Sequence, residues 1–279
     1  MSEQPQQPVT DSQTRFSNRV ADYIRYRPSY PAEVLAILER EAGLQPGAVV
    51  ADIGSGTGIS AEMFLKHGCT VFGVEPNEPM RSAAERLLAG YPKFRSIAAT
   101  AEATTLPDAS IDLITAAQAF HWFDRAKTRP EFARILKPGG RFAILFNTRL
   151  VDVSPFLQGY EALSIQFATD YTQIDHRNVD DRAVAEFFAP CKCEKRIVPN
   201  HQVFDYTGLK GRLLSSSYAP PPGHERHEPM LAALRKLFDE HAQPGDPSDA
   251  NKYPPDTPTV RFEYATEIYF GSLRGERGT

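Results

Sequence analysis

Short apolar runs alternate with amphipathic segments along the first half of the chain. The apolar runs are rich in β-branched residues, which is typical of buried parallel strands. They predict strands over residues 49–53, 70–75, 95–100, 110–117 and 141–146. Between the runs, apolar residues recur every three or four positions and predict helices over 32–42, 60–65, 79–88 and up to Leu136. The alternation predicts an α/β fold built on a mostly parallel sheet.

The second half of the chain has a less regular pattern. Amphipathic segments predict helices over 155–171, 180–188 and 230–241. Alternating segments predict strands over 195–206 and 259–270, and we expect these two to pair antiparallel although about fifty residues separate them. The remaining helices of this half are expected to form a cap.

The expected organisation therefore has four parts. Residues 1–14, rich in Gln, Ser and Pro, form a disordered tail. Residues 15–150 are a ligand-binding core with an N-terminal lid. Residues 151–192 are a helical cap inserted after the fifth strand. Residues 193–279 return to the core and carry a second cap segment at about 207–257.

Composition and charge narrow the classes of partner. The chain has 279 residues, 41% of them hydrophobic, and a net charge of −4, so no electrostatic case exists for binding nucleic acid or an anionic membrane. No apolar run approaches the roughly 20 residues of a membrane span, and the N-terminus lacks a secretory pattern. Three cysteines, Cys69, Cys191 and Cys193, are too few for a zinc site and predict free thiols. We expect a soluble, cytoplasmic protein without a metal.

The strand over 49–53 leads into a glycine loop at Gly54, Gly56 and Gly58, and a helix follows. Glycines at alternate positions let the backbone turn sharply and let a ligand approach the main chain closely. The N-terminal N–H groups of the helix face the loop. This arrangement is typical of a site for a nucleotide-like small molecule.

The spacing of the loop separates it from two common nucleotide sites. Neither the dinucleotide pattern G-x-G-x-x-G nor the phosphate-binding G-K-S/T is present. Asp52 would repel a pyrophosphate but attract a cation or an amine. Glu75 ends the next strand, 21 residues after Gly54, where an acidic residue holds ribose hydroxyls in doubly wound sheets. The sequence predicts a ligand with a ribose and a cationic, amine-bearing end.

The pattern D-x-G-x-G-x-G at 52–58, followed by V-E-P at 74–76, resembles the class I S-adenosylmethionine-dependent methyltransferases. The run A-F-H-W-F at 119–123 is similar to the segment after the fourth strand in the trans-aconitate methyltransferase-like group and related type 11 enzymes. The resemblance covers residues 15 to about 147. It implies S-adenosylmethionine as cofactor and a Rossmann-like, doubly wound, seven-stranded sheet, mostly parallel with an antiparallel last strand, that carries a helical cap.

The resemblance also implies cofactor contacts at the ends of the predicted strands. Ala101 and Glu102 would lie beside the adenine; the alternative is that Glu102 is an exposed residue of a turn. The Tyr- and Arg-rich segment 16–31 would be a lid over the cofactor or, alternatively, a surface segment docked on the fold. The residues expected to contact the cofactor are Tyr23, Arg27, Asp52, Gly54, Ser55, Gly56, Gly58, Glu75, Pro76, Met80, Ala101, Glu102 and Gln118.

Catalysis is expected at the end of the fourth strand, beside the point where the strand order reverses. His121 would lie near the transferable methyl group, or else pack on Trp122 as a structural histidine. His121 and Tyr218 are the candidate catalytic residues.

The implied activity is methylation of a small molecule, with a small organic acid methylated on a carboxylate oxygen as the first hypothesis. A carboxylate needs no base, only cationic or hydroxyl groups that hold it. The candidates for that task are Arg27, Arg149, His121, His201, Tyr160 and Tyr218. Two alternatives stay open: C- or O-methylation of a quinone, lipid or polyketide-like acceptor with His121 as base, and cofactor binding without catalysis. We expect a monomer or homodimer that binds neither nucleic acid nor a membrane.

Overall fold

The computed structural model describes residues 20–171, 179–245, 253–254 and 256–274. The expected tail and the first residues of the expected lid, up to residue 19, lie outside the described residues. So does much of the loop at the end of the expected second cap segment.

Among the described residues, eight strands form one sheet in the order β3-β2-β1-β4-β5-β8-β6, with β7 paired to β8 off this path. The strands are β1 (Val49–Ile53), β2 (Thr70–Val74), β3 (Phe94–Ile97), β4 (Ile111–Ala117), β5 (Leu136–Arg149), β6 (Cys193–Phe204), β7 (Gln243–Pro244) and β8 (Pro258–Gly271). Neighbours from β3 to β5 are parallel, whereas β8 is antiparallel to both β5 and β6. The expected doubly wound sheet with an antiparallel last strand is confirmed, and β7 was not predicted.

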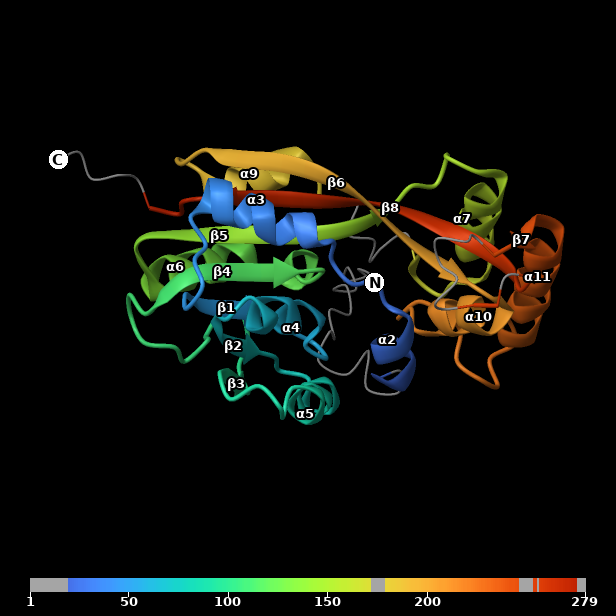
Figure 1. Cartoon of the computed structure of the whole chain (residues 1–279), viewed down its shortest axis with the longest axis horizontal. Coiled ribbons are helices and arrows are strands. Elements are labelled where there is room, and N and C mark those ends of the chain that lie inside the picture. Colours follow the sequence, from blue (N-terminus) through green and yellow to red (C-terminus); the bar gives the residue numbers. More distant parts are fainter. Residues whose placement is uncertain (1–19, 172–178, 246–252, 255, 275–279) are drawn as a thin grey trace, which may run out of the picture.

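Helices cover both faces of the sheet (Figure 1). The covering helices are α3 (Ala32–Ala42), α4 (Ile59–Lys66), α5 (Glu78–Leu87), α6 (Arg125–Ile135) and α9 (Asp181–Phe188). Apolar residues of α3 and α4 pack with Val50 and Leu145 on one face, and those of α6 and α9 pack with Phe142 and Ile144 on the other. Alternate residues of a strand point to opposite faces, so β5 contributes to both layers.

A third apolar cluster lies beyond the core, around the far ends of β6 and β8 (Figure 1). Three helices supply it: α7 (Pro155–Phe167), α10 (Tyr206–Leu214) and α11 (His227–His241). Their side chains surround Phe204 and Phe262, which are almost fully buried. The strands therefore run from the core into this second unit, which we call the cap.

Residues 151–192, expected as one cap segment, divide between the two units. Helix α7 packs in the cap cluster, but Val184, Phe187 and Phe188 of α9 pack on the core face with Phe142. The amphipathic pattern of α9 correctly predicted an apolar face and could not indicate which surface that face would cover.

The expected lid segment contains helix α2 (Val20–Tyr26), none of whose residues is buried. Helix α2 contacts α10 of the cap and α5 of the core, so it lies between the two units (Figure 1). Directly after α2, the guanidinium of Arg27 donates a hydrogen bond to the backbone carbonyl of Ser215, which follows α10 of the cap, at 3.0 Å.

Candidate active site

The loop between β1 and α4 is held in a conformation that favours glycine. Gly54, Gly56 and Gly58 have φ angles of 69°, 55° and 89°. The backbone N–H groups of Gly54 and Ser55 donate to the Val74 carbonyl at 2.8 and 3.3 Å, which fixes the loop to the end of β2. A Cβ at Gly54 would lie 2.6 Å from the Ala119 Cβ, so the loops after β1 and β4 touch here. The absence of side chains leaves main-chain groups accessible to a ligand.

Glu75 fastens the same loop from the end of β2. Its carboxylate accepts from the backbone N–H of Gly56 at 2.9 Å and from that of Asn77 at 2.8 Å. Burial raises its pKa, and the two N–H donors oppose that shift. The carboxylate is thus held rigidly at the wall of a cavity. Asn77 in turn caps α5 by accepting from the Met80 N–H at 3.0 Å.

Asp52 lies beneath the loop and lines neither of the two cavities described below. Its fully buried carboxylate accepts from the hydroxyls of Ser60 at 2.6 Å and Thr115 at 2.9 Å. It therefore joins the start of α4 to β4. Burial raises its pKa to about 6, against a partial opposing effect of these hydrogen bonds. A direct contact between Asp52 and a ligand amine, which the sequence suggested, has no support in this position.

Replacing Asp52 with asparagine is expected to change how stability depends on pH. The folded-state pKa of about 6 lies above the ordinary value of 3.8, so the folded protein holds this proton more tightly. The associated stabilisation is present below pH 4 and is lost as the pH rises through 6, about 3 kcal/mol in total. Urea denaturation measures the free energy of unfolding from pH 4 to 7. Over this range the wild type should lose about 3 kcal/mol relative to Asp52→Asn. A pH-independent difference would contradict the assignment.

A wide cavity of about 450 Å³, within the range of typical ligand sites, opens beside Glu75. It brings together residues from α2, the glycine loop and the ends of β2, β3 and β4. The expected cofactor and catalytic residues that line it are Tyr23, Gly54, Gly56, Glu75, Pro76, Met80, Ala101, Glu102, Gln118 and His121. Asn77, Thr100, Trp122 and Asp124 also line it and were not predicted, although the first three are each adjacent in sequence to a predicted residue. Their roles, like those of the predicted residues, stay predictions.

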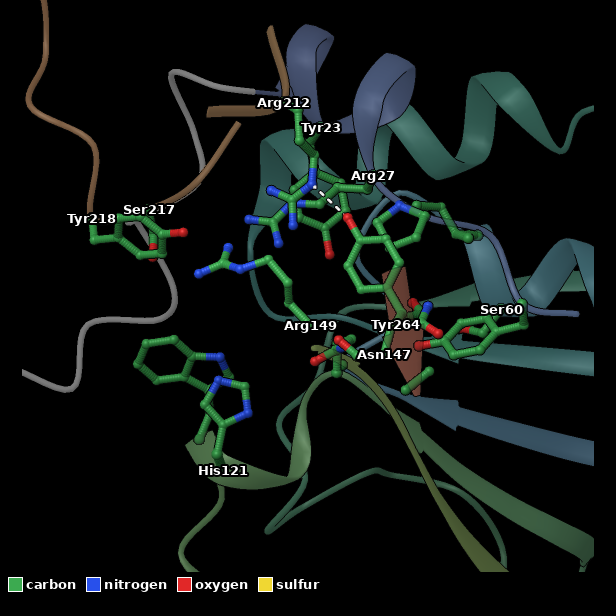
Figure 2. A pocket seen from close by; sticks show the side chains of 18 of the residues that line it. Tyr23, Arg27, Ser60, His121, Asn147, Arg149, Arg212, Ser217, Tyr218 and Tyr264 are labelled. Atoms are coloured by element: carbon green, nitrogen blue, oxygen red, sulfur yellow. Dashed lines mark hydrogen bonds between the residues drawn. The ribbon is translucent and has the colours of Figure 1, made fainter. Parts of the chain in front are cut away.

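A narrower cavity of about 150 Å³ continues from the glycine loop toward the cap. Figure 2 shows arginine and tyrosine side chains around it, with His121 at one side. Arg27, Ser55 and Tyr218, from the predicted set, line this cavity and not the wide one. Gly58 lines neither cavity; a Cβ there would lie 2.7 Å from Leu88, so its role is packing against the helix after β2. Of the residues suggested for holding an acid, His201 and Tyr160 do not line it.

Gln118 and His121 lie where the two cavities meet, because both residues line both. Gln118 has a φ of 56°, which is unusual for a residue with a side chain and common at functional sites. Its N–H donates to the Leu145 carbonyl at 2.8 Å and its side-chain amide to the Asn147 carbonyl at 3.1 Å. The turn that follows presents His121 with its ring 4.8 Å from that of Trp122. The position suits both readings of His121, beside a reacting group and packed on an aromatic ring.

Three arginines give the narrow cavity its charge. Arg149 pairs with Glu161 and donates to the Tyr171 hydroxyl at 2.8 Å. Arg212 donates to the hydroxyls of Ser216 at 3.2 Å and Tyr264 at 3.4 Å. Burial would raise the pKa of Tyr218, but the arginines, Arg149 first, lower it overall. Arg212 was missed by the sequence analysis; the one available signal was an arginine inside the apolar run of α10.

Comparison with known proteins assigns the central part of the chain to a domain family. Residues 51–144 match the family model described as a methyltransferase domain. The match identifies residues 51–144 as a methyltransferase domain. An uncharacterised methyltransferase of Mycobacterium tuberculosis is 38% identical to it over 139 residues, which are 50% of this chain and 54% of that protein. The chain therefore spans about half the length of the curated relatives it matches.

Solved structures extend the likeness of this methyltransferase domain to the fold of nearly the whole chain. A candidate type II methyltransferase from Anaeromyxobacter dehalogenans has a TM-score of 0.61 at 22% identity, covering 89% of this chain and 98% of that one. The YcgJ protein of Bacillus subtilis has a TM-score of 0.53 at 20% identity, covering 88% and 100%. At these identities the likeness concerns the fold alone. Membership of the trans-aconitate methyltransferase-like group stays a prediction.

Two further features bear on the methyltransferase site. Within the described ranges, no group of His, Cys, Asp and Glu side chains is arranged to hold a metal ion. No helix in this part of the chain is both long and apolar enough to cross a membrane.

Proposed function

We propose that the chain transfers a methyl group from S-adenosylmethionine to a small organic acid, forming a methyl ester at a carboxylate oxygen. The observation that carries the proposal is the junction of two unlike cavities at the end of β4. One has a glycine cradle and a fixed carboxylate, and the other has three arginines. The matched methyltransferase domain supports the cofactor class.

The residues of the wide cavity fit this cofactor. Glu75 would accept from the ribose hydroxyls, and Glu102 from the adenine amino group. Met80, whose methyl carbon would lie 3.3 Å from a Cβ at Gly56, supplies apolar surface. When bound, the cofactor supplies an electrophilic methyl group on a sulfonium. Gly54 and Gln118, common to both cavities, would border the reacting atoms.

The narrow cavity fits an acidic acceptor. Its guanidinium and phenol groups offer donors on several sides, and a carboxylate nucleophile arrives already ionised. No proton needs to be removed, so His121 would position the acceptor rather than act as a base. A second candidate, methylation of a hydroxyl or carbon acceptor, is favoured by one observation: the pKa of Tyr218, which burial would raise, is lowered by the arginines. A phenol with a lowered pKa is a better base near neutral pH.

Thermal unfolding with three ligands tests the cofactor class. A ligand at one hundred times its Kd stabilises the native state by about 2.7 kcal/mol, a shift of several degrees for a protein of this size. We expect this shift with S-adenosylmethionine and with S-adenosylhomocysteine, and none with NAD. A shift with NAD alone would refute the proposal.

His121→Ala is expected to spare cofactor affinity and to lower turnover about tenfold to a hundredfold, because a misplaced acceptor reacts slowly. Calorimetry with S-adenosylhomocysteine gives the affinity, and kcat is measured with whichever acid an acceptor screen identifies. His121→Asn, which keeps a polar group, should retain more activity. Full turnover in His121→Ala would make this histidine structural.

A further inference from the structure

The charges around the narrow cavity do not balance. Arg27, Arg149 and Arg212 come from three separate elements and face the same space (Figure 2). Among the described residues, one acidic partner is present, Glu161 on Arg149. Over the ranges that the structure describes, Arg27 and Arg212 therefore have no acidic partner.

The three arginines are also shielded from water. Arg212 is only 6% exposed, and its partners are neutral hydroxyls. In the described part of the chain, the Nε–H groups of Arg27 and Arg149 are buried and have no acceptor. Burial and then the nearby Arg212 lower the pKa of Arg27, as expected for like charges in one site. A buried unpaired cation costs several kcal/mol, so this cluster is suited to a bound anion that offsets the cost.

The reacting carboxylate is a poor choice for that anion. During methylation its oxygen forms a bond to the methyl carbon while the sulfur–methyl bond breaks, and the bonding pair stays on sulfur. The carboxylate loses its negative charge, and no proton moves. Arginines clamped on this group would lose interaction as the charge disappears, and would stabilise the ground state more than the transition state. They favour reaction only if they hold a group whose charge persists.

We propose that Arg212, which has no acidic partner among the described residues, binds a second, non-reacting anionic group of the acceptor with Arg149 beside it, and that the acceptor is therefore a small dianion. One carboxylate of this dianion is methylated at the junction beside Gln118 and His121, and the other stays charged in the arginine cluster. The proposal rests on the function proposed above and names the substrate class of the same site. The positively charged cluster then sets specificity against monoacids.

The test uses the full chain saturated with S-adenosylhomocysteine, so that no turnover occurs. Calorimetry at constant ionic strength measures the affinity of succinate, glutarate and adipate, each against its monomethyl ester. The esters keep the carbon chain and remove one charge. At least one diacid is expected to bind tenfold or more tightly than its ester. A fourth probe, 3-phosphonopropionate, replaces one carboxylate of succinate by a phosphonate. If this probe binds more tightly than succinate, the proposal is supported and the non-reacting group of the acceptor is a phosphate ester.

Two variants locate the effect. Arg212→Gln is expected to abolish the preference for the diacid, and Arg212→Lys to restore part of it, while affinity for S-adenosylhomocysteine is unchanged. Arg182→Gln, which removes an arginine 85% exposed on α9, is the matched control and should keep the full preference.

The outcomes separate the two proposals. If S-adenosylhomocysteine does not bind the wild type, the proposed function fails. If it binds but no diacid exceeds its ester, or the preference survives in Arg212→Gln, the dianion proposal fails and the methyltransferase function stands. Should Arg212→Gln not fold, the comparison of diacids with esters in the wild type decides alone.

Discussion

Replacing Gly54 with alanine is expected to destabilise the protein by about 2–4 kcal/mol and to weaken cofactor binding more than tenfold. The position has a φ of 69°, which costs a residue with a Cβ about 1–2 kcal/mol. The new Cβ would also lie 2.6 Å from the Ala119 Cβ, and neither group can rotate away. Forced overpacking of this kind costs about 1–3 kcal/mol. Urea denaturation measures the stability, and calorimetry with S-adenosylhomocysteine measures the affinity.

The double variant Gly54→Ala with Ala119→Gly separates the two costs. Removing the Ala119 Cβ relieves the contact but not the backbone strain, so about half of the stability should return. If the double variant is no more stable than Gly54→Ala, the contact between the loops after β1 and β4 is not the cause. If Gly54→Ala itself resembles the wild type, the described loop conformation is wrong.

Glu75→Ala is expected to weaken cofactor binding by about 1–3 kcal/mol, the cost of leaving a buried hydrogen-bonding partner unpaired. The same change leaves the N–H groups of Gly56 and Asn77 without their acceptor, so stability should fall as well. Glu75→Gln keeps the shape but places an amide NH₂ against one of these donors, and should also bind weakly. Calorimetry and urea denaturation measure the two effects separately.

The control for Glu75 is Glu78→Ala, which removes an exposed carboxylate in the first turn of α5. It should leave cofactor affinity unchanged. Loss of stability in Glu75→Ala without any loss of affinity would show that this carboxylate only braces the glycine loop, and the ribose assignment would be abandoned.

The sequence could indicate which residues line the wide cavity because that part of the site is local. Gly54, Ala101 and Gln118 directly follow predicted strands and Glu75 ends one, and parallel strands bring their carboxyl ends to one edge of the sheet. Strand order therefore placed Gly54 and Glu75 together, and the resemblance to the methyltransferase family added Ala101 and Gln118. All four line the wide cavity.

The acceptor half could not be predicted in the same way. Arg212 and Tyr264 reach the narrow cavity from the cap, and their placement depends on how α10 and β8 pack rather than on a nearby motif. Asp52 shows a different limit. Asp52 does precede the glycine loop in the structure. The alternation of side chains along a strand, however, does not indicate whether the carboxylate faces the cavity or the buried side of the loop.

The three long strands have a mechanical consequence. Because β5, β6 and β8 continue without a break from the core into the surroundings of the cap, a hinge between the two units would have to bend a hydrogen-bonded sheet. A ligand would then reach the narrow cavity through a more local opening. Helix α2 has no buried residue and contacts both units, so we expect its local unfolding to cost less than bending the sheet. The rate of product release in the proposed reaction would then be set by local unfolding of the seven residues of α2 rather than by a hinge motion of the cap.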